Sequence, residues 1–272
     1  MDTVSYNREA WNKESLKGSR WCEPVDAEMI KAAKAGEWSV ILTPNKSVPQ
    51  EWFGDLGGKK VLCLASGGGQ QAPILAAAGA SVVSFDNSDE QLAKDEMVGQ
   101  REELDLTIVR GDMADLSRFD DGSFDLIFHP VSNVFVESIG PVWQECCRVL
   151  EVGGRLLSGF MNPICYLFDD EEAEETGILQ VRYGLPYSDL KSRSKEYVDE
   201  LVRKGWSLQF GHTLEEQIGG QIEAGFVVCG FYEDSWNDEA HLLNKYASTS
   251  MATLSVKGSK TDDVEGGLAS GR

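Results

Sequence analysis

The chain has 272 residues, of which 42% are hydrophobic, and a formal net charge of −20 at pH 7. This length and apolar fraction predict one large globular domain with a sizeable core. The negative charge is not offset by any cluster of lysines and arginines. It disfavours nucleic acids and anionic membranes as partners, because their phosphates would repel the protein. No apolar run is long enough to span a bilayer.

The pattern of cysteines and histidines predicts no metal site. None of the six cysteines belongs to a Cys-x-x-Cys pair, and the chain has only three histidines. Cys63 and Cys229 fall inside expected strands, where we expect them to be buried as small hydrophobes. The first residues do not show a basic region followed by an apolar one. We therefore expect a cytoplasmic protein with reduced cysteines, as a monomer or a homodimer.

Residues 1–58 form an expected N-terminal cap of helices and aromatic side chains. The segment holds four of the seven tryptophans. Residues 6–16 and 26–35 have the pattern of helices, the second with Asp26 at its N-cap. The aromatic side chains either pack this segment onto the rest of the protein or close over a ligand. The sequence leaves both interpretations open.

Residues 59–160 alternate between short apolar runs and helical segments. Such an alternation is typical of a parallel, doubly wound α/β sheet. Ser88 and Gln91 match a capping box at the start of one of the helices. The expected strands are 61–64, 82–85, 106–109, 124–128 and 155–160, and the expected helices end near 78, 102 and 150.

Residues 161–209 interrupt the alternation and are expected to be an insertion that covers the substrate. The alternation returns in residues 210–257, which we expect to complete the same α/β core. Residues 258–272 are rich in Gly, Ser and Asp, and we expect a disordered tail. The expected elements after the insertion are a helix at 214–224 and strands at 226–232 and 252–256.

A glycine-rich turn follows the first expected strand. Gly67 and Gly69 satisfy the spacing Gly-x-Gly-x-x-Ala with Ala72, and Asp86 ends the second strand. Glycines let a backbone approach a ligand closely, and an acid at the second strand end can hold the ribose hydroxyls of an adenosine-containing cofactor. The unit therefore predicts a nucleoside cofactor, and by itself it permits NAD, FAD or S-adenosylmethionine.

Three later motifs discriminate among these cofactors. They are Gly111-Asp112-Met113, Phe124-Asp125-Leu126-Ile127 and the stretch Arg148-Val149-Leu150-Glu151-Val152-Gly153-Gly154. With the glycine turn and Asp86 they occur in the order and spacing of class I S-adenosylmethionine-dependent methyltransferases, which the chain resembles over roughly residues 61–257. The resemblance is to the group that includes ubiquinone/menaquinone-biosynthesis-type small-molecule enzymes. More narrowly, it is to a bacterial branch with no settled substrate.

The resemblance implies a Rossmann-like sheet of seven strands, mostly parallel with the final strand antiparallel, and helices on both faces. It also implies S-adenosylmethionine as cofactor and methyl transfer (EC 2.1.1 class) to an O, N, S or C nucleophile of a small molecule. The chain departs from the family pattern at Cys63, where an acid is usual, and at Ala65, where glycine is usual. The methionine end of the cofactor would then be held by Ser66, Gln70 or N-terminal residues.

Individual site residues follow from the matched motifs. Asp86 is expected to bind the ribose hydroxyls, with capping of the next helix as the alternative. Asp112 is expected to accept a hydrogen bond from the adenine amino group, with a turn as the alternative. His129 follows the fourth strand and would contact cofactor, substrate or neither. The expected cofactor-binding residues are Ala65, Ser66, Gly67, Gly69, Gln70, Asp86, Asn87, Asp112, Met113 and His129.

The acceptor is expected to lie between the N-terminal segment and the insertion, because both carry aromatic side chains. His212 is the candidate base, with a polar residue before a helix as the alternative, and Asp189, Tyr183 or Tyr187 could serve instead. Displacement at a sulfonium needs a base only when the nucleophile arrives protonated. The candidate pocket residues are Tyr6, Trp11, Asn133, Tyr183 and Tyr187.

Two other functions remain open at this point. The glycine turn alone also fits an NAD(P)-dependent oxidoreductase. The departures at Cys63 and Ala65 also fit a non-catalytic protein that keeps the cofactor-binding fold.

Overall fold

The computed structural model describes residues 1–236 and 242–259. Its centre is a seven-stranded sheet in the order β3-β2-β1-β4-β5-β9-β8. The strands are β1 (Lys60–Leu64), β2 (Ser81–Asp86), β3 (Leu106–Arg110), β4 (Phe124–His129), β5 (Leu150–Met161), β8 (Phe226–Asp234) and β9 (Ser250–Lys257). Adjacent pairs are parallel from β3 to β5, whereas β9 runs antiparallel between β5 and β8. The predicted fold is thereby confirmed.

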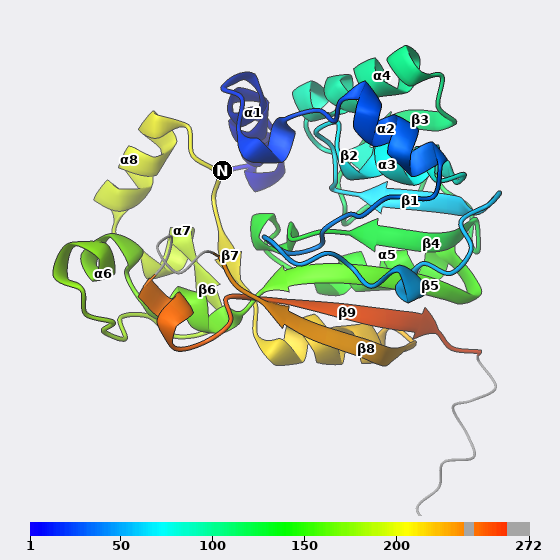
Figure 1. Cartoon of the computed structure of the whole chain (residues 1–272). Helices are drawn as coiled ribbons and strands as arrows, with labels where there is room; N and C mark the ends of the chain where they lie inside the picture. Colours follow the sequence, from blue (N-terminus) through cyan, green and yellow to red (C-terminus); the bar gives the residue numbers. More distant parts are fainter. Residues whose placement is uncertain (237–241, 260–272) are drawn as a thin grey trace, which may run out of the picture.

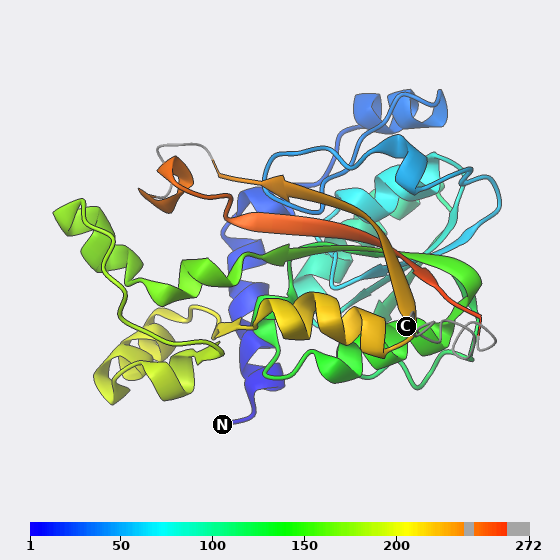
Figure 2. The ribbon, with the colours of Figure 1, turned by 90° about the horizontal axis from the view of Figure 1, so that it is seen from below.

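Helices cover both faces of this sheet (Figure 2). One layer contains α2 (Ala27–Lys34), α3 (Gln71–Ala77) and α4 (Asp89–Glu102), and the other contains α5 (Gly140–Val149) and α9 (Gly220–Glu223). Asp26 and Ser88 begin α2 and α4 by accepting the amides of Met29 and Gln91, which satisfies groups that a helix start leaves free. Alternate residues of β1 enter different layers: Val61 and Cys63 face α2–α4, and Leu62 and Leu64 face α5.

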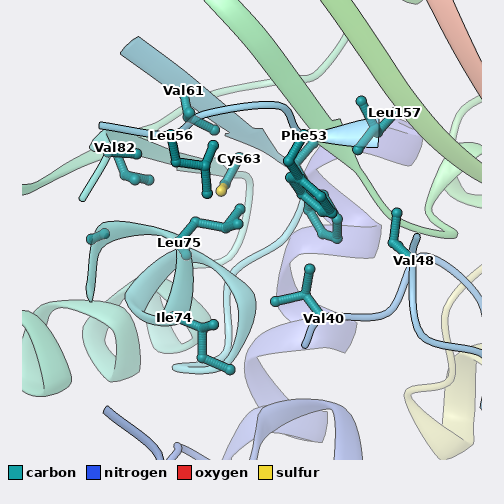
Figure 3. Close-up of a cluster of buried hydrophobic side chains, with 14 of the residues drawn as sticks. Val40, Val48, Phe53, Leu56, Val61, Cys63, Ile74, Leu75, Val82 and Leu157 are labelled. Atoms are coloured by element: carbon teal, nitrogen blue, oxygen red, sulfur yellow. The ribbon is translucent and has the colours of Figure 1, made fainter. Parts of the chain in front are cut away.

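The layer beside α3 is extended by the segment that follows α2. Figure 3 shows Val40, Val48 and Phe53 of this segment lying near Leu75 and Leu157, all of them in one buried cluster. Trp38 packs edge-on against Phe53 with ring centroids 5.0 Å apart, and Trp52 packs on Tyr232 at 5.3 Å. These two tryptophans therefore serve packing rather than ligand contact.

The remaining elements lie beyond the carboxyl ends of the parallel strands (Figure 1). Helix α1 (Thr3–Leu16) packs against α4 there. The insertion contributes α6 (Asp170–Thr176), β6 (Tyr187–Ser188), α7 (Asp189–Ser192) and α8 (Lys195–Lys204). Short strand β7 (Phe210–Gly211) pairs with β6 instead of joining the central sheet. The segment 1–58 is thus divided between the strand ends and one face of the sheet.

Two details differ from the sequence-based expectations or fall outside the described chain. Cys229 is exposed, not buried, because it lies in the edge strand β8 where the pairing register with β9 shifts between Val228 and Gly230. Residues 260–272 of the expected tail lie outside the described residues. Within the described ranges, no helix is both long and apolar enough to cross a membrane.

Gly159 of β5 provides a test of how the N-terminal segment packs on the sheet. A Cβ at Gly159 would lie 2.2 Å from the carbonyl oxygen of Leu42, which accepts the amide of Val131. We expect Gly159→Ala to lower the free energy of unfolding by about 2–3 kcal/mol through overpacking, measured by chemical denaturation. Gly140→Ala is the control, because no atom lies within 4 Å of its added Cβ. Equal stability of the two variants would contradict this packing.

Candidate active site

A cavity of about 770 Å³ lies at the carboxyl ends of the strands. One side is made by the residues that end or follow β1 to β5. Helix α1 and the insertion make the other sides. The polar and aromatic residues of its wall include Trp11, Ser66, Asp86, Asn87, Asp112, Tyr166, Tyr187, Asp189, Arg193, Tyr197 and Trp206. This edge of a parallel sheet is where ligands bind in doubly wound folds.

The glycine loop after β1 is held by carboxylates. Asp86 Oδ2 accepts the amide of Gly67 at 3.0 Å, and Asp95 Oδ1 accepts the amide of Gly69 at 2.7 Å. A Cβ on Gly69 would lie 2.8 Å from Pro24 Cβ. The carbonyl of Gly69 accepts the amide of Val25. Gly69 therefore packs against residues 24 and 25 and does not line the cavity, whereas Gly67 does.

Ala65 occupies a position where the family usually has glycine, and its backbone shows why. It has φ = 49°, in the left-handed region, while its amide donates to the Phe85 carbonyl at 2.7 Å. Its neighbour Ser66 also lines the cavity. The Ser66 hydroxyl is buried with no hydrogen-bond partner among the described residues, and the thiol of Cys63 is the polar group beside it.

Asp86 supports the residue that caps α4, and its place in the cavity wall leaves ribose binding open to it. Its second oxygen, Oδ1, accepts the amide of Ser88 at 2.8 Å, just before α4 begins. The residue also lines the cavity. Burial raises the pKa of the carboxyl, and the amides of Ser88 and Gly67 oppose that rise.

Gln70 and Asn87 line the cavity and also hold the N-terminal segment over it. The Gln70 side chain donates to the carbonyls of Arg20 and Glu23 at 2.7 and 2.9 Å. Asn87 Nδ2 donates to the carbonyl of Val4 at 2.9 Å. These amide groups couple the strand-end side of the cavity to α1 and to the segment that follows it.

Asp112 and Met113 line the cavity beyond β3. One carboxylate oxygen of Asp112 accepts the amide of Ala114 at 3.0 Å, which is the turn contact named as its alternative. Gly111 is required by packing, because a Cβ there would lie 2.2 Å from Phe85 Cζ.

Three predicted site residues are buried behind the cavity wall. His129 bonds through Nδ1 to the Leu64 carbonyl at 3.0 Å and through Nε2 to the Asn133 side chain at 2.8 Å. The Asn133 amide donates to Gln217 of a π-helical segment, Glu215–Gly219. His212 Nε2 donates to the carbonyls of Asn133 and Val136, both at 3.0 Å.

This network corrects the expected place of these residues, since neither histidine nor Asn133 is among the cavity-lining residues. Burial lowers the pKa of both histidines and favours the neutral rings. The geometry gives His212 a structural role: it holds the turn at 133–136, and Val134 and Phe135 of that turn line the cavity.

Of the four aromatic residues predicted to line the substrate pocket, two line the cavity and two do not. Trp11 and Tyr187 line the cavity, and Trp11 packs edge-on against Phe135 at 5.0 Å. Tyr6 and Tyr183 do not line it: Tyr6 Oη donates to the carbonyl of Trp206 at 2.7 Å, and Tyr183 Oη donates to Asp169 at 2.9 Å.

Tyr187 belongs to a charged cluster in the insertion. Its hydroxyl donates to Asp189 Oδ1 at 2.6 Å and accepts from Arg193 Nε at 2.9 Å. Arg193 also forms an ion pair with Asp169 and lies over the Tyr183 ring, 4.5 Å from its centroid. Burial raises the pKa of Asp189, while the Tyr187 and Arg193 contacts lower it.

Sequence reasoning missed Asp95, Gln217 and Arg193. Asp95 and Gln217 are polar residues in helical segments, and only their burial reveals their contacts. Among the described residues, no group of three or more His, Cys, Asp or Glu side chains could hold a metal ion.

Comparison with known proteins gives one consistent result. A family profile described as "Methyltransferase domain" matches residues 62–158. The uncharacterized methyltransferase YbaJ of Bacillus subtilis is 50% identical over 254 residues, which are 93% of this chain and 98% of YbaJ. This chain belongs to the class I S-adenosylmethionine-dependent methyltransferases.

Solved structures agree with this assignment at the level of fold. An S-adenosylmethionine-dependent methyltransferase from Mesorhizobium loti aligns with a TM-score of 0.55 and 18% identity over 76% of this chain and 95% of the other. A geranyl diphosphate methyltransferase in complex with SAM aligns with a TM-score of 0.52 and 16% identity over 76% and 82%. The cofactor of the present methyltransferase is therefore S-adenosylmethionine.

The residues of the cavity fit this cofactor. Ser66, Asp86 and Asp112 line one space, next to a loop whose glycine at 67 leaves the backbone accessible, and the buried hydroxyl of Ser66 has no hydrogen-bond partner among the described residues. A nucleoside with an amino-acid tail has hydroxyl and amino donors for each of these acceptors.

The strain at Ala65 can be tested directly. Ala65→Gly removes the left-handed strain of an L-residue, which outweighs the greater chain entropy of glycine, so we expect the free energy of unfolding to rise by about 0.5–1 kcal/mol. Glu103→Gly is a matched control, because Glu103 has φ = 52° at the end of α4, away from the cavity wall. Thermal and urea unfolding should show a gain for both variants; a loss at position 65 would contradict the account of strain.

Proposed function

We propose that this methyltransferase transfers the methyl group of S-adenosylmethionine to a small molecule by in-line displacement. The observation that carries the proposal is that one cavity joins the strand-end acids Asp86 and Asp112 to an aromatic wall formed by Trp11 and Tyr187. Aromatic walls with a few polar groups are typical of small-molecule pockets. The net charge of −20 supports a small molecule over a nucleic acid. Cytoplasmic location and a monomeric or dimeric state stay predictions.

The strand-end side of the cavity is assigned to the cofactor. Asp86 would hold the ribose hydroxyls and Asp112 the adenine amino group. Ser66 and Gln70 would hold the methionine end of the cofactor; both line the cavity, and the Gln70 side chain contacts Arg20 of the N-terminal segment. When bound, S-adenosylmethionine supplies an electrophilic methyl group on a sulfonium centre. The main task of the protein is then to hold the acceptor in line with that methyl group.

The insertion side is assigned to the acceptor and to its proton. The Tyr187 hydroxyl lies between Asp189 and Arg193 and lines the cavity. A hydroxyl or amine of the acceptor could pass its proton to Tyr187 Oη while the tyrosine proton moves to Asp189 Oδ1. This pair replaces His212 as the candidate base, because His212 is not among the residues that line the cavity.

The decisive experiment is calorimetric titration of the protein with S-adenosylmethionine and with NAD. Binding of S-adenosylmethionine alone is expected. Binding of NAD alone would reject the proposal. Absence of binding to either, in a folded protein, would favour the non-catalytic alternative.

Asp86→Ala is expected to weaken the binding of S-adenosylmethionine roughly 10- to 100-fold. A hydrogen bond to a charged acceptor contributes about 1.5–3 kcal/mol, and the variant also releases the amide of Gly67. Calorimetry on the folded variant measures the loss. Asp89→Ala is the control, because Asp89 is an exposed acid of α4 that pairs with Arg110 and does not line the cavity. Unchanged affinity in the Asp86 variant would refute its assignment.

The pH dependence tests Asp189. A base must be ionised, so the rate of methyl transfer should fall as the pH drops through the raised pKa of Asp189. Asp189→Asn and Tyr187→Phe should lower the rate about 10²-fold or more, and Asp189→Asn should remove this acid limb. Transfer of labelled methyl groups to an acceptor found in a panel of phenols, alcohols and amines measures the rate. Tyr183→Phe is the control, and equal loss in it would argue for a structural effect.

A further inference from the structure

Asp95 is a fully buried acid that the proposed chemistry does not use. It lies in α4 with no exposed surface, and its side chain reaches Ser84 of the neighbouring strand β2. Its two oxygens have different partners: Oδ1 accepts the amide of Gly69 at 2.7 Å, and Oδ2 accepts the hydroxyl of Ser84 at 2.6 Å. One carboxylate thus ties the glycine loop to strand β2 from a third element.

The surroundings of Asp95 explain why the loop needs this acid. Ser84 is the register partner of Cys63 on β1. Figure 3 shows Cys63 among Leu56, Leu75 and Val82, so the strand itself offers no carboxylate to the loop. Gly69 cannot turn its amide to another acceptor without moving away from residues 24 and 25, against which it packs.

We propose that Asp95 is a positioning residue of the cofactor site: from helix α4, its carboxylate holds the glycine loop in the form that binds S-adenosylmethionine. The inference rests on the proposed cofactor site, since it needs the cavity side of the loop at Ala65 to Gly67 to contact the cofactor. Asp95 itself does not line the cavity and acts only through the loop.

The protonation state of Asp95 changes when the pH is varied around neutrality. Burial raises its pKa to about 7, the Ser84 and Gly69 donors oppose the rise, and the Asp86 carboxylate adds to it. The thiol of Cys63, whose pKa burial also raises, faces Asp95 from β1, and α3 carries no titratable residue. An ionised Asp95 accepts at both oxygens. A protonated Asp95 offers the Gly69 amide a neutral acceptor, which binds an amide more weakly than a carboxylate does, so the loop is held less firmly below pH 7.

The test is the affinity for S-adenosylhomocysteine, the demethylated product, measured by calorimetry from pH 6 to pH 8. Wild-type affinity is expected to rise with pH across this range. Asp95→Asn keeps the shape of the side chain and removes its charge; it should bind about tenfold more weakly at pH 8 and lose the dependence on pH. Wild-type affinity and pH dependence in this variant would overturn the inference.

Asp125→Asn is the matched control. Asp125 also accepts one backbone amide and one side-chain donor, from Lys60 at 2.8 Å and Lys59 at 2.6 Å, but it lies in β4 near the start of that strand and away from the cavity. The Asp125→Asn variant should lose stability and keep its affinity for S-adenosylhomocysteine. An equal loss of affinity in both variants would make the effect a general one of stability and overturn the positioning role.

Ser84→Ala keeps the inference testable if Asp95→Asn does not fold. Removing the Ser84 hydroxyl takes away a donor that lowers the pKa of Asp95, so the midpoint of the affinity profile should move to higher pH. An unmoved midpoint would overturn the inference. Wild-type protein that does not bind S-adenosylhomocysteine at any pH would contradict the cofactor assignment itself, and the inference with it.

Discussion

The glycine loop between β1 and α3 is the constraint on which the rest of the site depends. Its amides must be held without filling the space where a ligand approaches. Asp86 of β2 and Asp95 of α4 each accept one of these amides. The backbone amide of Val25, in the N-terminal segment, donates to a carbonyl of the loop. Buried carboxylates are costly unless they receive hydrogen bonds, and each of these two receives a pair. Loop and acids therefore stabilise each other.

This arrangement gives the N-terminal segment a structural part in the site. Residues 21–25 fill the space next to Gly68 and Gly69, where a Cβ on Gly68 would lie 2.5 Å from the carbonyl of Trp21. The side chains of Gln70 and Asn87 hold other parts of the N-terminal segment by donating to the carbonyls of Arg20 and Val4. The strand-end side of the cavity is thus assembled from two parts of the chain, and neither part forms it alone.

Polar groups behind the cavity keep its far wall in place. His129, Asn133 and Gln217 form a chain of buried hydrogen bonds from the end of β4 to the π-helical segment, and His212 holds the turn between them. Fully satisfied buried networks of this kind rigidify a site. On the insertion side, Arg193 draws the hydroxyls of Tyr183 and Tyr187 together with Asp169. The far wall is therefore anchored by groups that do not line the cavity, whereas on the insertion side Tyr187 and Arg193 line the cavity themselves.

The sequence by itself determined the alternation of strands and helices along the chain and a nucleoside cofactor, and the family resemblance added the seven-stranded sheet and S-adenosylmethionine. Those features rest on local patterns: alternation of apolar runs, glycine spacing, and acids at strand ends such as Asp86 and Asp112. Tertiary structure alone decided which polar residues reach the cavity. Nothing in the sequence around His212 or Asp95 shows its role, because each role depends on burial and on partners far away in the chain. Such contacts leave no periodicity in a sequence, because they form only when the elements pack.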